Sequence, residues 1–232
     1  MKAVIQAAGQ ATRLRPVTYE IPKPLISVKK KPILSHLLES FKAHGVKEAT
    51  VVIRPDHQED FSWWHKRHGA TLPAISFFTE PEPLGTFGGM KFLQDKFSEA
   101  FILANADVLH DFPVSKLIEA HKNNPEKPVA TIALVPVENP SDFGVAVMEG
   151  NKIKEFLEKP KNPPTNFINA GVYVLEPEVF KYADFSKGAL MIEKDIFPKL
   201  AVEGKLAGYK FENSRWIDCG TFERWEKAIK EW

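Results

Sequence analysis

The chain has 232 residues, of which 44% are hydrophobic and 26% are charged, a composition that suits an ordinary globular protein with a sizeable core. Its 31 Lys and Arg residues balance 30 Asp and Glu residues, so the formal net charge of +1 excludes a broad basic surface for nucleic acid. The single cysteine, Cys219, excludes an internal disulfide framework and a multi-thiolate zinc site. The N-terminus has too few apolar residues for a signal peptide and no run is long enough to span a membrane, so we expect a cytoplasmic protein.

The first half of the chain alternates strand-like apolar runs with segments of helical periodicity. Apolar residues at Ile33, Leu34, Leu37, Leu38 and Phe41, for example, recur at helical spacing. The same patterns predict strands at Ala3–Ile5, Ala49–Ile53, Ile75–Phe78 and Ala100–Ala104, and helices at Ile33–His44, Glu59–His68 and Gly85–Lys96. Such alternation is typical of an α/β fold with a Rossmann-like, mostly parallel sheet and helices on both faces.

The second half is richer in proline, glycine and short β segments. The predicted elements are strand Val129–Val135, a hairpin of Val145–Met148 and Ile153–Leu157, strands Ala170–Leu175, Ala207–Phe211 and Arg215–Asp218, and helices Val114–Lys122, Pro177–Tyr182, Glu193–Val202 and Phe222–Glu231. The change in pattern near Pro136 suggests one domain with two lobes. Residues 1–135 would mainly bind nucleotide, and residues 136–232 would form a smaller hairpin-rich lobe for the substrate, with a closing helix.

The loop that follows the first strand has the composition of a phosphate-binding loop. Its small residues Ala7, Ala8, Gly9 and Ala11 allow a ligand to approach the backbone, while Thr12 and Arg13 add a hydroxyl and a guanidinium group. Further on, Lys23 stands between two prolines that fix its backbone. Taken alone, the loop is better interpreted as a surface turn with solvated basic residues, because it contains neither a G-x-G-x-x-G fingerprint nor a P-loop.

The order of motifs along the whole chain is more specific than any one of them. The loop reads AAGQATRLRPVT and is followed by PKPL and KPIL; downstream come EPLGT, NAD, FGV, EKP, NAG and WIDCGT. In this order the chain resembles the sugar-phosphate nucleotidylyltransferases, which make a nucleoside diphosphate sugar and pyrophosphate from an NTP and a sugar 1-phosphate. The resemblance implies a glycosyltransferase-A-like nucleotidyltransferase fold.

The resemblance also implies a Mg²⁺ cofactor and a set of catalytic residues. Asp107 and Asp218 match the family's metal ligands, and two carboxylates with phosphate oxygens and water suit Mg²⁺. Arg13 matches the residue that contacts the triphosphate, and Lys23 matches one placed at the reacting phosphates. Taken singly, either aspartate is also compatible with a helix cap or a turn.

Further matches concern the binding of the two substrates. The resemblance assigns nucleotide binding to Ala7, Ala8, Gly9, Gln10, Ala11, Thr12, Arg13, Lys23, Leu84, Gly85, Thr86 and Asn105. It assigns the sugar phosphate to Gly144, Glu158, Lys159, Asn169 and Gly171, with Lys159 on the phosphate and Glu158 on sugar hydroxyls. Without the motif order, Glu158 and Lys159 would be interpreted as solvated side chains on a hairpin, and Gly144 and Gly171 as residues at β-bulges.

Two departures from the family pattern concern the nucleotide. Ala11 stands where glycine is usual, and Phe87 stands where a small residue usually follows Gly-Thr, so Phe87 either narrows the base pocket or turns into the core. The closing part of the sugar lobe looks most like mannose-1-phosphate guanylyltransferases. Uridylyl- and thymidylyltransferases acting on glucose 1-phosphate or an amino-sugar 1-phosphate share much of the same frame and remain alternatives.

Other expectations follow from the same comparison. The alternative of a different class is a non-catalytic protein that binds a nucleotide sugar, although such a protein needs no complete set of charged catalytic residues. The chain ends at Trp232, so we expect no C-terminal β-helix domain and no acetyltransferase activity. Family members often form dimers or tetramers, which makes a homo-oligomer an open expectation. Cys219 is expected to be a small buried residue and not a nucleophile.

Overall fold

The computed structural model describes residues 1–232, which divide into two compact units. Unit 1 comprises Met1–Pro83, Ala104–Phe112 and Arg215–Trp232, and unit 2 comprises Leu84–Leu103 and Pro113–Ser214. The units are therefore interleaved along the chain, and one passage between them falls within strand β6 (Phe101–Asn105). No helix has the length and apolar character needed to cross a membrane.

Unit 1 contains three parallel strands in the order β5-β4-β1. These are β1 (Lys2–Gln6), β4 (Glu48–Ile53) and β5 (Ala74–Thr79), accompanied by helices α2 (Ile33–Ala43) and α3 (Gln58–His68). Alternation of strand and helix gives parallel pairing, as predicted. Trp64 on α3 donates a hydrogen bond of 2.9 Å to Ser35 Oγ on α2, which ties the two helices together.

Shorter elements complete unit 1. They are α1 (Val17–Glu20), the strands β2 (Ser27–Val28), β3 (Lys31–Pro32), β7 (Val108–His110) and β13 (Trp216–Asp218), and the helix α6 (Phe222–Glu231). Strand β7 pairs antiparallel with β13, so a segment from the middle of the chain lies beside one near its C-terminus. The pairing of β7 is a feature that the sequence patterns do not predict.

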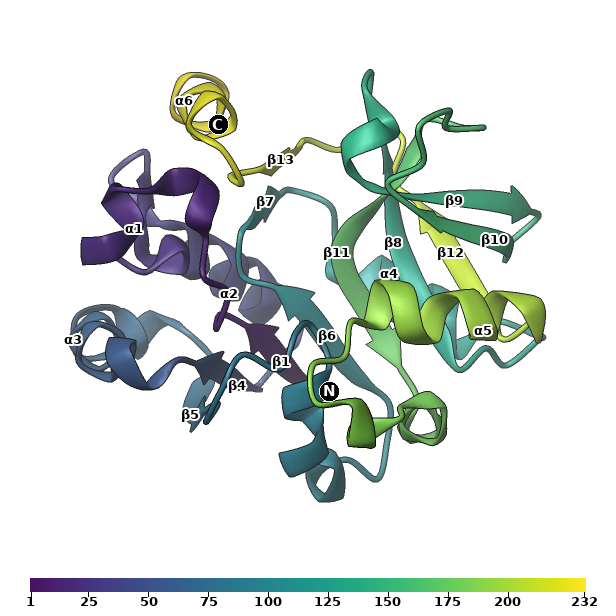
Figure 1. Ribbon diagram of the computed structural model, residues 1–232, viewed down its shortest axis with the longest axis horizontal. Coiled ribbons are helices and arrows are strands. Elements are labelled where there is room, and N and C mark those ends of the chain that lie inside the picture. Colours follow the sequence, from purple (N-terminus) through teal and green to yellow (C-terminus); the bar gives the residue numbers. More distant parts are fainter. The chain divides into compact units, whose positions relative to one another are not determined.

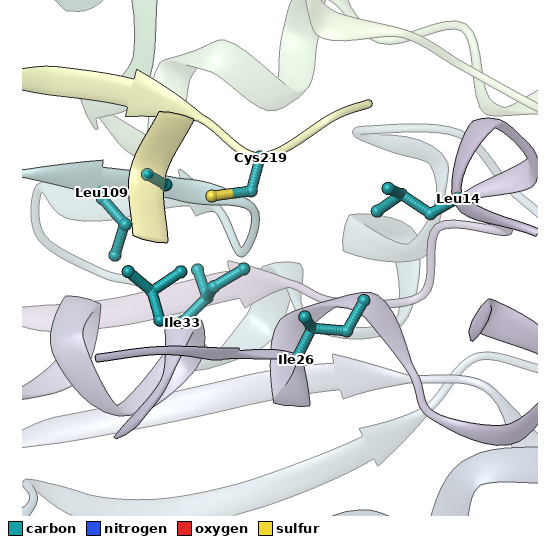
Figure 2. Close-up of a cluster of buried hydrophobic side chains, with 7 residues drawn as sticks. Leu14, Ile26, Ile33, Leu109 and Cys219 are labelled. Atoms are coloured by element: carbon teal, nitrogen blue, oxygen red, sulfur yellow. The ribbon is translucent and has the colours of Figure 1, made fainter. Parts of the chain in front are cut away.

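A buried apolar cluster supports these short elements. Figure 2 shows Leu14, Ile26, Ile33 and Leu109 gathered about the Cys219 side chain, each from a different segment of unit 1. Cys219 has no exposed surface, and burial raises the pKa of its thiol to about 12, so the thiolate needed for nucleophilic chemistry is disfavoured. The prediction that Cys219 is a buried structural residue is confirmed.

Unit 2 has a mixed sheet built on β8 (Ala130–Pro136). This strand pairs antiparallel with β11 (Phe167–Leu175) and parallel with β12 (Leu206–Lys210). Beside β12 lies the predicted hairpin of β9 (Gly144–Glu149) and β10 (Lys152–Glu158) (Figure 1). The helices are α4 (Val114–Lys122) and α5 (Phe197–Val202). The predicted α/β class is confirmed, with strands of unit 2 pairing in both directions.

Three predicted helices of unit 2 differ in the structure. Gly85–Lys96 is not an α-helix but contains the short 3₁₀ segments Gly88–Phe92 and Gln94–Lys96. Pro177–Tyr182 is also 3₁₀, and the Glu193–Val202 prediction becomes a π-helical turn, Ile192–Ile196, followed by α5. Gly85 adopts a left-handed φ of 78°, and the Phe87 N–H donates to Leu190 O and not to a helical partner, so tertiary contacts override the apolar periodicity.

Buried His110 should make the stability of the protein depend on pH. Its ring stacks on Phe112 with centroids 3.8 Å apart, and neither ring nitrogen has a hydrogen-bond partner. Burial lowers the pKa of His110 from 6.5 to about 4, so the folded state binds its proton less readily than the unfolded state. Stability from the neutral ring is fully present above pH 6.5 and falls by up to about 3 kcal/mol as pH drops towards 4.

The variant His110→Phe tests this source of pH dependence. Urea unfolding between pH 7.5 and 4 should show a weaker loss of free energy of unfolding in the variant than in the wild type, because the titrating ring is gone. His57→Phe, which makes the same substitution at a partly buried histidine directly before α3, is the matched control. Equal pH slopes for His110→Phe and the wild type would contradict the assignment.

Candidate active site

The β7–β13 pairing brings the two predicted metal ligands of unit 1 together. Asp218, the last residue of β13, is in register with Val108, and the Cys219 N–H donates to Asp107 O at 3.0 Å. Asp107 and Asp218 are therefore held on neighbouring backbone segments. The motifs NAD and WIDCGT, which are far apart in the sequence, supply one carboxylate each to the same place.

Two cationic side chains bind these carboxylates. Lys23 Nζ lies 2.5 Å from Asp107 Oδ2 and 3.9 Å from Asp218 Oδ1, and Arg224 Nη1 lies 2.5 Å from Asp218 Oδ2. Lys23 is the first residue of a short 3₁₀ helix, Lys23–Leu25, and the prolines on either side of it, Pro22 and Pro24, fix its backbone. Lys23 is only 9% exposed, so water screens its charge weakly. The PKPL motif predicts Lys23 near the phosphates, whereas no motif marks Arg224.

The environment separates the acidities of the two aspartates. Burial raises the pKa of Asp107, but the charge and hydrogen bond of Lys23, together with a backbone hydrogen bond and the Arg13 charge, outweigh burial, so the pKa of Asp107 lies below its ordinary value. For Asp218, burial and the neighbouring Asp107 charge together raise the pKa, although Lys23 and Arg224 oppose them. Asp107 is thus the carboxylate that is more readily kept ionised.

Gly220 brings Arg13 to the same cluster. A Cβ atom at Gly220 would lie 2.7 and 2.9 Å from the Asp218 carboxylate oxygens and 3.0 Å from Arg13 Nη2. No side chain fits there without displacing one of these charged groups. Glycine at this position therefore lets Asp218 and the Arg13 guanidinium approach the same stretch of backbone, so that Arg13 lies near Lys23, Asp107 and Asp218.

The predicted nucleotide loop follows β1 and is open to ligands. The N–H of Ala7 is bonded to Val52 O of β4, whereas Gly9 has no atom within 4 Å of the position of a Cβ. Ala8, Gly9, Gln10 and Thr12 are partly or fully exposed, and Asn105 closes β6, whose next residue Ala106 donates to Gln6 O. The backbone of this loop is therefore accessible at the carboxyl end of β1, where α/β folds bind ligands.

Ala11 adopts a left-handed conformation, with φ 48° and ψ 42°. Its carbonyl accepts a hydrogen bond from Thr18 Oγ1 at 2.9 Å and another from the Leu14 N–H, which hold the loop in this shape. An alanine Cβ is unfavourable in this region by about 1 kcal/mol compared with glycine. The conformation explains why glycine suits this position.

Ala11→Gly should therefore raise the free energy of unfolding by up to about 1 kcal/mol, because glycine relieves the unfavourable φ. Ala8→Gly in the same loop is the matched control, since Ala8 has a negative φ and glycine there only adds freedom to the unfolded chain. Chemical unfolding measures both variants. Destabilisation of the two by the same amount would show that the left-handed conformation carries no cost.

The predicted sugar-phosphate residues lie in unit 2, several of them on the β9–β10 hairpin. Gly144 is opposite Glu158 in this hairpin, and a Cβ on Gly144 would come within 3.0 Å of Glu158 Oε2. Lys159 follows Glu158 with a left-handed φ of 51°, its N–H donates to Phe143 O, and its Nζ lies 3.6 Å from Glu158 Oε1. The Lys159 side chain is 60% exposed and so is accessible to an anion.

Asn169 belongs to a buried polar network of unit 2. Its Oδ1 accepts from the Gly171 N–H at 2.8 Å and its Nδ2 donates to Tyr173 Oη at 2.9 Å. Tyr173 donates to Glu193 Oε1 at 3.3 Å, and Thr86 Oγ1 donates to Glu193 Oε2 at 2.6 Å. The network joins the Leu84–Thr86 loop to the Asn169–Gly171 segment of β11.

Glu193, like Tyr173, is a member of this network that the sequence motifs do not predict. Burial raises the pKa of the Glu193 carboxyl, while the hydrogen bond from Thr86 opposes this rise. Its sequence context resembles an ordinary amphipathic helix, and only the tertiary structure shows that the carboxylate points into the unit. Phe87 is completely buried and packs against Phe180 and Phe185, so it has turned into the core of unit 2.

Comparison with solved structures identifies the fold. A candidate glucose-1-phosphate thymidylyltransferase from Bacillus anthracis superposes with a TM-score of 0.90 at 24% identity, over 99% of this chain and 94% of that one. HddC from Yersinia pseudotuberculosis, solved in complex with GMP-PN, gives a TM-score of 0.82 at 26% identity, over 99% and 98% of the two chains.

Curated relatives match over nearly the whole chain. A mannose-1-phosphate guanyltransferase from Yarrowia lipolytica is 38% identical over 228 residues, and one from Saccharomyces cerevisiae is 36% identical over 229 residues. Each match covers 95% of this chain and 61% of the relative, so the chain spans about three fifths of the length of these proteins. The Nucleotidyl transferase family model matches residues 2–232, and the chain therefore belongs to the nucleotidyl transferase family.

Proposed function

We propose that the protein makes a nucleoside diphosphate sugar and pyrophosphate from an NTP and a sugar 1-phosphate, with GTP and mannose 1-phosphate as its substrates. The observation that carries the reaction is the unit 1 cluster of Lys23, Asp107, Asp218 and Arg13. The substrate pair is supported by relatives named mannose-1-phosphate guanyltransferase and by the similarity to a structure complexed with GMP-PN. The match of one family model to residues 2–232 supports treating both units as one nucleotidyltransferase domain.

The residues present suit a divalent metal. Asp107 and Asp218 offer hard oxygen donors on adjacent segments. The Lys23 ammonium lies near both carboxylates, which shows that the two can share one positive charge. We propose Mg²⁺ as the metal and these two carboxylates as its protein ligands. When bound, Mg²⁺ would neutralise part of the negative charge on the phosphates.

The other charged residues act on the phosphates directly. A phosphate oxygen of the sugar 1-phosphate attacks the α-phosphorus of the NTP, a new P–O bond forms, and the bond to the β-phosphate breaks. The attacking oxygen is already ionised, so the step needs no general base. Lys23 and Arg13 can donate hydrogen bonds to the phosphates and stabilise the charge that develops on the leaving pyrophosphate.

Unit 2 supplies the proposed sugar-phosphate contacts. Exposed Lys159 binds the phosphate, and Glu158 accepts hydrogen bonds from sugar hydroxyls. Asn169 uses both ends of its amide within unit 2, so we assign it to fixing the backbone at Gly171, where the left-handed φ of 75° requires support. Thr86 has the same role for its own loop, because Glu193 and the Ile192 N–H occupy its hydroxyl.

Pyrophosphate release tests the proposal. The protein is incubated with Mg²⁺, each of five NTPs and a panel of sugar 1-phosphates that includes mannose, glucose and N-acetylated amino sugars. We expect the fastest release with GTP and mannose 1-phosphate. Faster release with UTP or dTTP would replace the substrate pair, and absence of release with every pair would contradict the activity and favour a protein that only binds nucleotide sugars.

A further inference from the structure

We propose that Lys23 and Arg224 prevent free divalent cations from binding to the Asp107 and Asp218 carboxylates. The two carboxylates then bind a metal ion only together with a triphosphate. This inference rests on the proposed function for the identity of the metal and the nucleotide. It adds a role for Arg224, which is a positioning residue that acts through Asp218.

The carboxylates are already occupied by the chain's own cations. Lys23 Nζ lies 2.5 Å from one carboxylate and 3.9 Å from the other, which is the position of a cation shared between them. Arg224 Nη1 binds the second carboxylate at Oδ2, 2.5 Å away. A metal ion that binds both aspartates must therefore replace the Lys23 ammonium.

The charge balance of the cluster makes this replacement unfavourable for a metal alone. Two carboxylates face three cationic side chains, those of Lys23, Arg224 and Arg13. The Lys23 and Asp218 side chains are only 10% and 12% exposed, so water screens these two charges weakly, and it screens Asp107 and Arg224, at 35% and 24%, somewhat more. A dication would enter a site that already carries excess positive charge.

A triphosphate reverses this balance because it brings several negative charges and many acceptor oxygens. The Lys23 ammonium can then leave Asp107 Oδ2 and donate its hydrogen bonds to phosphate oxygens, so no buried charge loses its partner. Arg224 stays on Asp218 Oδ2 and keeps the other oxygen, Oδ1, directed at the Lys23 side of the cluster. The lysine that holds the carboxylates in the free protein thus becomes a phosphate ligand in the complex.

Binding of Mn²⁺ without nucleotide tests the inference, with electron paramagnetic resonance as the readout. The wild type should bind Mn²⁺ weakly, and a non-hydrolysable GTP analogue should tighten binding by more than about tenfold. Lys23→Met and Arg224→Gln should each bind Mn²⁺ more than about tenfold more tightly than the wild type without nucleotide, because each removes a positive charge near the carboxylates. Lys29→Met, on an exposed lysine of the same unit, is the matched control and should not change the affinity.

Each outcome has a distinct meaning. Equal Mn²⁺ affinity of the wild type, Lys23→Met and Arg224→Gln without nucleotide would overturn the inference, even if the wild type turns over. Adding Asp107→Asn to Lys23→Met should abolish the gained affinity; if it does not, the gain comes from another site and the inference fails. Circular dichroism checks folding, and Arg224→Gln carries the test alone if Lys23→Met does not fold. Pyrophosphate release by the wild type independently tests the proposed function.

Discussion

Asp107→Asn should lower kcat by about 10³-fold or more while leaving the fold intact, because a neutral amide cannot replace the carboxylate in a cluster built to hold charge. The change keeps the size of the side chain and removes the partner of Lys23 at 2.5 Å. Pyrophosphate release measures kcat, and circular dichroism measures folding. The loss should appear at saturating concentrations of both substrates, since it concerns the chemical step.

Asp56→Asn is the control for this experiment. Asp56 is an exposed aspartate of unit 1 that pairs with Arg54, and its substitution should leave turnover unchanged. Substantial residual activity in Asp107→Asn would mean that the metal assignment is wrong. Loss of activity together with loss of the circular dichroism signal would instead place the role of Asp107 in folding.

Lys159→Ala should raise KM for the sugar 1-phosphate by about 10- to 100-fold, because a charge-assisted hydrogen bond to its phosphate is lost. KM for the NTP should change little. Alanine is preferred to glycine for this test because Lys159 has a left-handed φ of 51°, and glycine would also release the backbone. Initial rates with each substrate varied in turn separate the two KM values.

Lys161→Ala provides the matched control, two residues further along the same exposed segment. It removes an equal charge from the same surface and should change neither KM by more than about twofold, as expected for a screened surface charge. Equal increases in both KM values for Lys159→Ala would contradict a role specific to the sugar phosphate. Identical effects of the two substitutions would indicate a general electrostatic contribution.

Much of the secondary structure could be predicted because it depends on local periodicity. The predicted helix Val114–Lys122 coincides with α4, and Phe222–Glu231 coincides with α6. Where backbone partners are tertiary, the prediction fails. The Gly85–Lys96 segment has helical spacing of apolar residues, but Phe87 bonds to Leu190 and packs into an aromatic cluster, which breaks the segment into 3₁₀ turns.

The candidate site divides in the same way. Asp107 and Asp218 could be predicted because each lies at or just after the end of a strand within a recognisable motif, and the β7–β13 pairing brings them together. Arg224 and Glu193 could not be predicted, since Arg224 meets Asp218 across the turn before α6, and Glu193 meets Thr86, 107 residues earlier, only in the folded unit. Charged residues on apparently ordinary helices give no local sign of such a contact.

The three-segment construction of unit 1 has a consequence for the order of events during synthesis. Residues 215–232 supply β13, Asp218 and Arg224, whereas β7 and Asp107 are made about a hundred residues earlier. On the ribosome, the nascent chain can therefore form parallel β1 and β4 long before its carboxylate pair exists. Until residues 215–232 emerge, Asp107 is the only one of the two carboxylates contacted by Lys23 that the nascent chain contains, so the cluster is completed last.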